Sequence, residues 1–550
     1  MYGSIGKHRC FSQHQWNDSS VKKCCKLIYR IKWLRNKGAI LVLIWSFCVI
    51  SLYQHYYSLL TGESFGFAPL IIILIAFSLA LFFPVGGWLA DVYFGRYKVI
   101  HMSILTMWVS SILIVVCYIV KQVAVNWDSA VTTILYILYI VAGIGLGGFQ
   151  ANVIQFGIDQ LTDASSTDIS SFIVWYTWTI FSSVVPYLLL EKESSSVYRA
   201  LLPATSLSLV LCLDLLFNNL LVKEPITRNP FKLIYGVIKY MMRHKQPQQR
   251  SAFTYCEDEI PSRIDFGKSK YGGPFTTEQV EDVKTFFRML VVISIGSAVG
   301  LVCAVVQYPQ HKVYKHLQGY DSSEWYKRIG YGQIFPTFMM VPVYELAVYP
   351  LFQKYLVHFN YTKKIILAIC ISLLHLTTLV VMEGTVRHVP DPSHNMTCIF
   401  SDYKFTININ YQWFQLIEQP NYIASFLFFV GTVEFICSQS PYAMKGILLG
   451  MCYSLSGLNL AMQGLVTLPF ILKSIWGGVP LPCGFWYFLL QIFITLIFGT
   501  TFIVVIKWMY KKRSREDVLP NEQVFAIQYY ERYANVSSSS SSESDINTDK

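Results

Sequence analysis

The sequence is poor in charged residues. Asp, Glu, Lys and Arg make up 14% of its 550 residues, whereas hydrophobic residues make up 53% and aromatic residues 16%. Soluble globular domains carry about 25% charged residues, so this composition excludes an ordinary soluble domain. The shortage of charge indicates instead that lipid surrounds most of the chain.

Several motifs of other protein classes are also missing. There is no G-x-x-x-x-G-K-[ST] loop for an ATP-driven pump, no His/Cys cluster with zinc spacing, and no basic run interleaved with base-stacking aromatics. The glycines from Gly143 to Gly148 resemble a dinucleotide fingerprint only on paper, because no strand precedes them. We therefore expect no cofactor, no metal, no nucleic-acid partner and no enzymatic activity, since no soluble catalytic domain is left over.

Long apolar runs are the main feature that is present. A helix needs about 20 apolar residues to cross a bilayer, because its backbone amides must be satisfied within the helix. The chain contains twelve such segments, at 38–60, 65–90, 98–120, 130–156, 169–190, 199–222, 286–308, 328–352, 364–386, 423–442, 448–472 and 485–508. The fold class predicted is an all-α membrane protein with twelve transmembrane helices in two halves of six.

The polar stretches divide the chain into five parts. We expect a basic N-terminal segment, two six-helix bundles, a linker with an amphipathic helix at Pro230–Gln246, and a disordered tail; the five parts are 1–37, 38–222, 223–285, 286–508 and 509–550. Lysines and arginines crowd both ends of the chain, so both ends should face the cytoplasm. The net charge of +11 is then explained by bases beside anionic membrane lipids.

Four stretches carry a family resemblance. They read "GGWLADVYFGRYKVI" (86–100), "GIGLGGFQANVIQFGIDQL" (143–161), "FIVWYTWTIFSS" (172–183) and "GTVEFICSQSPYAMKGILLGMCYSLSG" (431–457). The first resembles the cytoplasmic loop signature of the major facilitator superfamily, and all four are similar to the proton-dependent oligopeptide transporter family. The linker around 250–286 looks like that of the animal peptide/histidine transporters.

The resemblance implies a transporter that works by alternating access between its halves. In this superfamily the loop between the second and third helices pins neighbouring helices in one of the two states, so Asp91 and Arg96 would inherit a gating role. Glu345 resembles a family position at the cytoplasmic half of the eighth helix, where we expect it to belong to a gate.

The charges that the family uses for protons and peptide termini are mostly absent here. Its E-x-x-E-R set on the first helix corresponds to Trp45, Cys48 and Val49, and no carboxylate lies between 38 and 60. The family's cavity lysine corresponds to Gln150, and its glutamate for the peptide amino terminus corresponds to Ser425. Proton coupling by the family's usual route is therefore in doubt. The residues we expect at the cavity or gate are Tyr53, Gln150, Asn152, Tyr176, Ser425 and Glu434.

The remaining titratable groups within the spans have structural interpretations beside functional ones. We interpret Asp214 and Glu383 as solvated head groups near helix ends, His101 as interfacial and His375 as a helix–helix hydrogen bond. Asn395 lies in a sequon between the ninth and tenth helices and is a predicted N-glycosylation site. Cys398 and Cys483 share the non-cytosolic face, which leaves one disulfide open.

The predicted substrates are di- and tripeptides, histidine or related compounds, with protons as a second partner left open. The alternatives are a uniporter or exchanger for another small solute, and a receptor or adaptor that kept the scaffold without transporting. A plasma-membrane and an endolysosomal location both fit the sequence.

Overall fold

The computed structural model describes residues 36–62, 80–123, 128–161, 164–182, 196–223, 229–243, 262–314, 317–318, 335–348, 351, 360–385, 387–388, 406–456 and 483–515. The predicted glycosylation site Asn395, Cys398, and the predicted N-terminal segment and tail lie mainly or wholly outside these residues.

Each predicted apolar segment overlaps a described helix, some of them only in part. The long helices are α2 (Lys37–Gly62), α4 (Arg96–Val123), α5 (Asp128–Asp159), α6 (Ser166–Ser182), α8 (Ser196–Phe217), α11 (Thr277–Tyr314), α15 (Tyr361–Thr385), α16 (Tyr411–Gln439) and α18 (Cys483–Arg515). A helix at Ala80–Phe94, the shorter α13 (Phe335–Val343) and a helix at 445–456 account for the remaining segments. Among the described residues, six helices are long and apolar enough by themselves to cross a membrane.

Local sequence determines where several helices begin. The Asn36 side chain accepts hydrogen bonds from the amides of Gly38 and Ala39 at the start of α2. Ser165 and Asp168 bond to each other's amides at the start of α6. Such side-chain caps satisfy amides that have no partner within the helix, and each contributes about 1 kcal/mol. Gly95 turns the chain into α4 with a positive φ of 81°, which glycine adopts at little cost.

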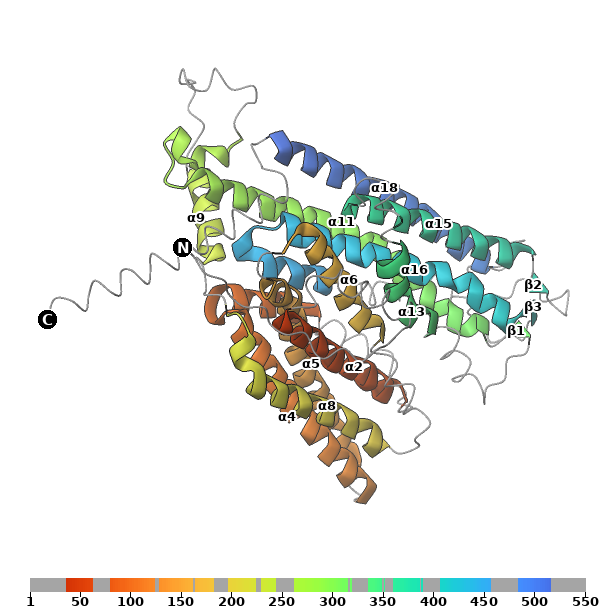
Figure 1. Ribbon diagram of the computed structural model, residues 1–550. Helices are drawn as coiled ribbons and strands as arrows, with labels where there is room; N and C mark the ends of the chain where they lie inside the picture. Colours follow the sequence, from red (N-terminus) through yellow and green to blue (C-terminus); the bar gives the residue numbers. More distant parts are fainter. Residues whose placement is uncertain are drawn as a thin grey trace, which may run out of the picture.

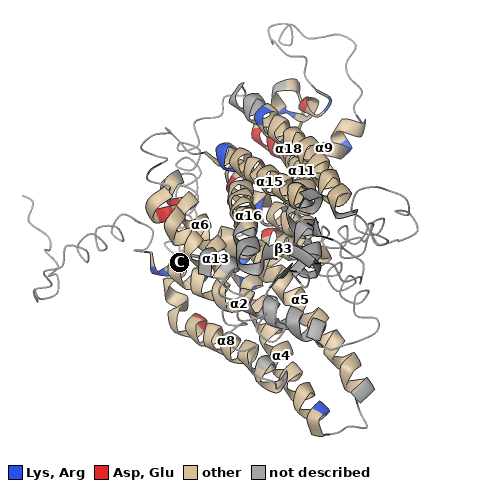
Figure 2. Cartoon of the chain, turned by 90° about the vertical axis from the view of Figure 1, so that its right-hand side faces the viewer, with Lys and Arg blue, Asp and Glu red and all other residues tan. Residues whose placement is uncertain are grey.

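The long helices gather in two groups. In Figure 1, α2, α4, α5 and α8 form the lower group, and α11, α15, α16 and α18 form the upper group. α6 contacts both α13 and α16, so it joins the first half of the chain to the second. The helices in Figure 2 carry few charged residues along their length, as expected for segments surrounded by lipid. The all-α membrane architecture is therefore confirmed.

The linker forms a small folded unit at one end of the bundle. The amphipathic helix is confirmed as α9 (Pro230–Arg243), capped by Asn229, with its first turn opened by Pro230. Two short 3₁₀ turns, η5 (Asp265–Gly267) and η6 (Ser269–Tyr271), then lead into α11, whose first turn is closed by reciprocal bonds between Thr276 and Gln279. α9 packs beside α11 (Figure 1), and this end is called the α9 end below.

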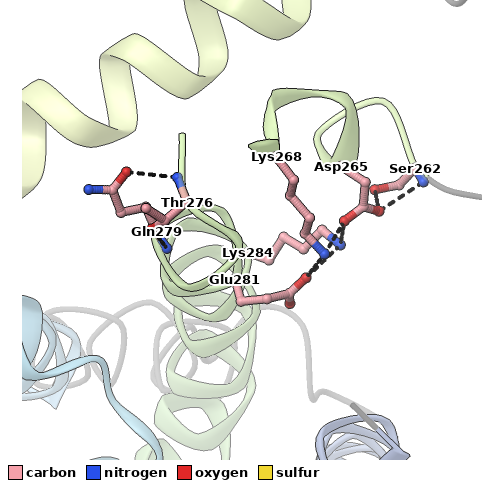
Figure 3. A network of polar contacts seen from close by, with 7 residues as sticks. All are labelled: Ser262, Asp265, Lys268, Thr276, Gln279, Glu281 and Lys284. Carbon is pink, nitrogen blue, oxygen red and sulfur yellow. Dashed lines mark hydrogen bonds and ion pairs between the residues drawn. The ribbon is translucent and has the colours of Figure 1, made fainter. Parts of the chain in front are cut away.

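A ring of four charges holds the linker unit together. Lys268 Nζ lies 2.7 Å from Asp265 Oδ1 and 2.5 Å from Glu281 Oε1. Lys284 pairs with the same two carboxylates, and Figure 3 shows both lysines pointing into the gap between them. Two acids thus share two bases, and the turns η5 and η6 are fastened to the first turns of α11.

Three short strands at the other end depart from a purely helical chain. β1 (Leu317–Gln318), β2 (Arg387–His388) and β3 (Thr406–Asn410) form a sheet in the order β1-β3-β2. They lie to the right in Figure 1, at the far end from α9. Their residues belong to the connections between the predicted apolar segments, so within the described residues these segments contain no strand.

Candidate functional site

The loop that resembles the family signature builds a set of contacts at the α9 end. Arg96, in the first turn of α4, lies 2.6 Å from Asp159 in the last turn of α5. Asp91 lies 3.9 Å from the same guanidinium and accepts a hydrogen bond of 3.1 Å from the amide of Ile447. Ile447 stands near the start of helix 445–456, where free amides and the helix dipole favour a carboxylate. We call Asp91, Arg96, Asp159 and Ile447 the first latch.

Glycines allow the backbones to meet beside the first latch. A Cβ atom built at Gly87 would lie 2.2 Å from the carbonyl oxygen of Gly446. One at Gly450 would lie 2.4 Å from the carbonyl oxygen of Phe83. Two backbones cannot come this close if either carries a side chain at the point of contact. The first and second halves of the chain therefore touch through bare backbone at this end.

A second set of contacts joins the halves nearby. Lys364, in the first turn of α15, lies 2.5 Å from Glu434 in α16, and its side chain is 1% exposed. Ser170 and Ser171, near the start of α6, donate hydrogen bonds to Glu434 and Glu345 respectively. Glu345 sits in the π-helical turn η8 (Tyr344–Val348) that follows α13. We call Glu345, Lys364, Glu434 and Ser171 the second latch.

The second latch repeats the first in the other half of the chain. In both, an acid in a π-helical turn at the end of the half's second helix reaches the start of the fifth helix of the opposite half. In both, a base in the first turn of the third helix pairs with an acid near the end of the fourth. π-helical turns are rare overall, and those that occur are frequently found at functional sites. The repeat gives each half one acid in a π-helical turn that crosses to the other half and one ion pair within the half, and in the second latch this ion pair also bonds to Ser170 of the first half.

Two further predicted site residues belong to the same end. Asn152 is fully buried and donates hydrogen bonds to the carbonyl oxygens of Gly86 and Gly148, with its own oxygen facing Gly446. This position favours a role in holding the gate helices over direct contact with a solute. Tyr176 of α6 is also fully buried, and its hydroxyl neighbours that of Tyr453 from the other half.

The structure does not gather the remaining predicted cavity residues at the latches. Gln150 on α5 and Ser425 on α16 are both half-buried, on different halves of the chain. Tyr53 belongs to α2, and its side chain lies outside the described part of the structure. Glu434 is held by Lys364 and Ser170, which places it in the second latch.

The first helix is apolar at the three positions that correspond to the acid–base set of the family it resembles. Trp45 is 1% exposed and Val49 is fully buried, and both belong to the hydrophobic core with Cys48. The apolar residues at these positions are thus packed, which is how an uncharged helix gains stability.

Two interpretations of titratable groups can be compared with the structure. The interpretation of Asp214 as a solvated head group is wrong: it is 2% exposed, 2.7 Å from His101 Nδ1 and 3.1 Å from the hydroxyl of Tyr97. A buried carboxylate is stable only when polar partners surround it, and α4 supplies both partners here. The predicted helix–helix bond of His375 is confirmed, because its Nδ1 donates to the carbonyl oxygen of Ile417 at 3.0 Å. The side chain of Glu383 lies beyond the described residues.

Sequence reasoning missed Asp159, Lys364 and Ser171. Asp159 falls just outside the apolar segment 130–156 and Lys364 is the first residue of the segment 364–386, places where charge usually means solvent contact, yet both are buried. Their positions in the first or last turn of a helix, at equivalent places in the two halves, were the available signal. Among the described residues, no group of three or more His, Cys, Asp or Glu could hold a metal ion.

Similarity to known proteins is modest in sequence. No family model matches the chain. Solute carrier family 15 member 5 of Homo sapiens is 25% identical over 238 residues, which cover 40% of this chain and 40% of that protein. Solute carrier family 15 member 3 of Mus musculus is 20% identical over 435 residues, 70% of this chain and 74% of the relative.

Similarity in structure is broader. An auto-inhibited POT family peptide transporter matches with a TM-score of 0.57 at 15% identity, over 86% of this chain and 97% of that one. The POT family transporter PepTSo also matches with a TM-score of 0.57, at 14% identity, over 86% of this chain and 98% of that one. At these identities the likeness establishes the fold. The sequence relatives are named as solute carriers, and the two solved structures are named as POT family transporters.

Proposed function

We propose that this chain, which the sequence and fold similarities support as a POT family member of the major facilitator superfamily, carries small solutes across a membrane by alternating access. The substrates we propose are di- and tripeptides, histidine or related compounds. The relatives are named as solute carriers and peptide transporters, and that is the reason for this substrate class.

The repeated pair of latches is the observation that carries the proposal. A transporter must close each end in turn, so the contacts that close one end have to be strong enough to hold and few enough to release. In each latch the carboxylate of the π-helical turn accepts a hydrogen bond from the opposite half, 3.1 Å from the amide of Ile447 to Asp91 and 2.5 Å from the hydroxyl of Ser171 to Glu345. We assign gating to Asp91, Arg96 and Glu345 on this basis.

The solute would bind between the halves, beyond the latches. We propose Tyr53, Gln150, Tyr176 and Ser425 as residues that orient it, with Asn152 and Glu434 at the boundary between binding and gating. Gln150 can both donate and accept hydrogen bonds, so it suits a neutral or zwitterionic solute better than an anionic one.

Proton coupling, if present, must use other groups than the first helix offers. The latches contain four carboxylates and two bases, Arg96 and Lys364, while Lys445 adds a buried base at the start of helix 445–456. Ionisable groups within a membrane protein often belong to proton relays. Glu434 and Glu345 are the carriers we propose for that case.

Uptake by proteoliposomes tests the proposal. The purified protein is reconstituted, and entry of a labelled dipeptide and of labelled histidine is measured with and without an inward proton gradient. We expect saturable uptake of at least one solute above protein-free liposomes. Uptake that rises with the gradient and loses that rise in Glu434→Gln would identify the carrier. If neither solute enters under either condition, the proposed substrate class is wrong.

Uptake that does not change with the proton gradient would support facilitated transport, which is the second candidate function. The packed apolar residues Trp45 and Val49 favour it, because the family's proton-coupling charges are replaced by core side chains at these positions.

The membrane of residence, plasma or endolysosomal, is a separate proposal that microscopy of a tagged chain would test. Glycosylation at Asn395 is another, tested by the mobility change on glycosidase treatment.

A further inference from the structure

The surface of α9 divides into three stripes. One stripe, Pro230, Ile234 and Val237, is buried against the protein. A second stripe is apolar and exposed: Phe231, Tyr235 and Met242 have 43%, 64% and 69% of their surface free. With 3.6 residues per turn, positions spaced by four and seven lie on one side of a helix, so these three residues form a continuous line.

The third stripe is basic. Lys232, Lys239 and Arg243 are spaced by seven and four residues, so they share one side of the helix and run alongside the exposed apolar line. α9 contains no Asp or Glu. Lys239 Nζ lies 5.5 Å from the ring centre of Tyr235, so its stem follows the aromatic side chain and its charge ends beside it.

Aromatic residues beside the first latch continue the exposed apolar line. Phe231 meets Trp88 edge-on with ring centres 6.2 Å apart, and Trp88 in turn meets Tyr93 at 5.4 Å. Tyr93 and Phe94 belong to the π-helical turn η2 (Ala90–Phe94) that carries Asp91, and they are 55% and 44% exposed. Aromatic rings gather at the level of lipid headgroups, where one end is apolar and the other wet.

We propose that α9 and η2 together form a docking platform for the anionic headgroups of the surrounding bilayer. The exposed apolar line enters the acyl boundary, and the three bases beside it meet lipid phosphates and carboxylates. A helix with an apolar face and a basic face lies in the membrane interface for these reasons, and its binding depends on anionic lipid. The platform ties the turn that carries Asp91 to the membrane surface, so lipid composition bears on the first latch. The inference requires only that the chain resides in a membrane, and it stands apart from the proposed solute.

Hydrogen exchange in two lipid compositions tests the platform. The full chain is placed in nanodiscs of phosphatidylcholine alone, or with phosphatidylserine as a minority lipid, and exchange is followed over 230–243 and 90–97. We expect phosphatidylserine to slow exchange of α9 by about fivefold or more, the effect of about one basic residue held at an anionic surface. Exchange over 90–97 should slow in the same direction.

Two matched charge variants keep the test specific. The triple variant Lys232→Gln, Lys239→Gln, Arg243→Gln should lose the difference between the two lipids while keeping the wild-type exchange in phosphatidylcholine. Lys37→Gln, Lys363→Gln, Lys507→Gln removes equal charge from exposed positions elsewhere and should keep the difference. Equal exchange of the wild-type chain in both lipids overturns the proposal, and so does an equal loss in both triple variants. Because solute uptake is not measured, the outcome is independent of whether the transport proposal holds.

Discussion

At the scale of single residues, the Lys364–Glu434 pair is the contact with the clearest energetic consequence. Lys364 is 1% exposed and Glu434 10% exposed, so both charges have left water. Such a pair contributes little net stability compared with apolar residues, because desolvation opposes the attraction. Removing one partner is costly, however, because the other charge stays buried and unpaired.

We therefore predict that Lys364→Met destabilises the protein by about 3 kcal/mol, and that Lys364→Met with Glu434→Gln recovers most of the loss. Thermal unfolding in detergent, with Glu434→Gln as the third member of the cycle, measures the coupling. An equal loss of stability in Lys364→Met and in the double variant would contradict a direct pair.

The four-charge ring in the linker gives a pH dependence. Burial alone would raise the pKa of Asp265, but bonds from Lys268, Lys284 and Ser262 outweigh burial and hold that pKa well below its usual range. The pKa of Glu281 is lowered in the same way by the two lysines, against the effect of burial. The pKa of Lys268 is raised by the two carboxylates, again against burial.

These directions fix the sign of the effect. A carboxylate with a lowered pKa contributes stability above its unfolded pKa of about 4 and loses it as the pH falls further. A lysine with a raised pKa contributes stability below its unfolded pKa of about 10.4 and loses that stability only as the pH rises above it. We predict that residues 262–284 keep their protection from protease between about pH 5 and about pH 8. They should lose this protection as the pH falls below about 4. Lys284→Met should abolish this acid-dependent step, and an unchanged acid profile in that variant would count against the ring.

At the scale of elements, the α9 end depends on helices that touch without side chains between them. Gly87 meets Gly446 and Gly450 meets Phe83 through backbone atoms, each across the two halves. Gly145 is packed as tightly, but against Met107 and Ser103 of α4, within one half. Alanine needs extra space at either kind of site. Only at the contacts between the halves must one half of the chain move away from the other to provide it.

We predict that Gly87→Ala opens the α9 end. Its Cβ would lie 2.2 Å from a carbonyl oxygen that has no side chain to move aside, so the helices must separate. Hydrogen exchange over 80–94 and 445–456 should rise by about tenfold, equivalent to about 1.4 kcal/mol of lost closure. Gly145→Ala is the matched control. It should lower thermal stability without raising exchange at 445–456, and a rise there in both variants would refute the assignment.

Elements were also the level at which the sequence was most informative. Each of the twelve apolar segments overlaps a described helix, several of them only in part, and the α9 limits were predicted to within a few residues, because hydrophobic periodicity and caps are local properties. The same local reasoning failed for Asp214. Its place near the end of an apolar run suggested a solvated head group, whereas Tyr97 and His101 of another helix enclose it.

At the scale of the whole molecule, the two latches make the α9 end a repeated structure. Each half contributes an acid in a π-helical turn and receives one at the start of its fifth helix. Rocking one half against the other would break both crossing contacts together, while the ion pairs Arg96–Asp159 and Lys364–Glu434 stay within their halves. A two-fold arrangement of this kind suits alternating access, because the end opens and closes as one unit.

The sequence by itself determined that the chain is a helical membrane protein and where most of its helices lie, and it predicted Asp91, Arg96 and Glu345 as gate residues and Glu434 as a cavity or gate residue. Only the tertiary structure decided their partners: Asp159 for Arg96, Ile447 for Asp91, Ser171 for Glu345 and Lys364 for Glu434. Helix position follows from local hydrophobicity, which any stretch of sequence carries. A contact such as that of Asp91 with Ile447 joins residues 356 positions apart, and it exists only once both halves have packed.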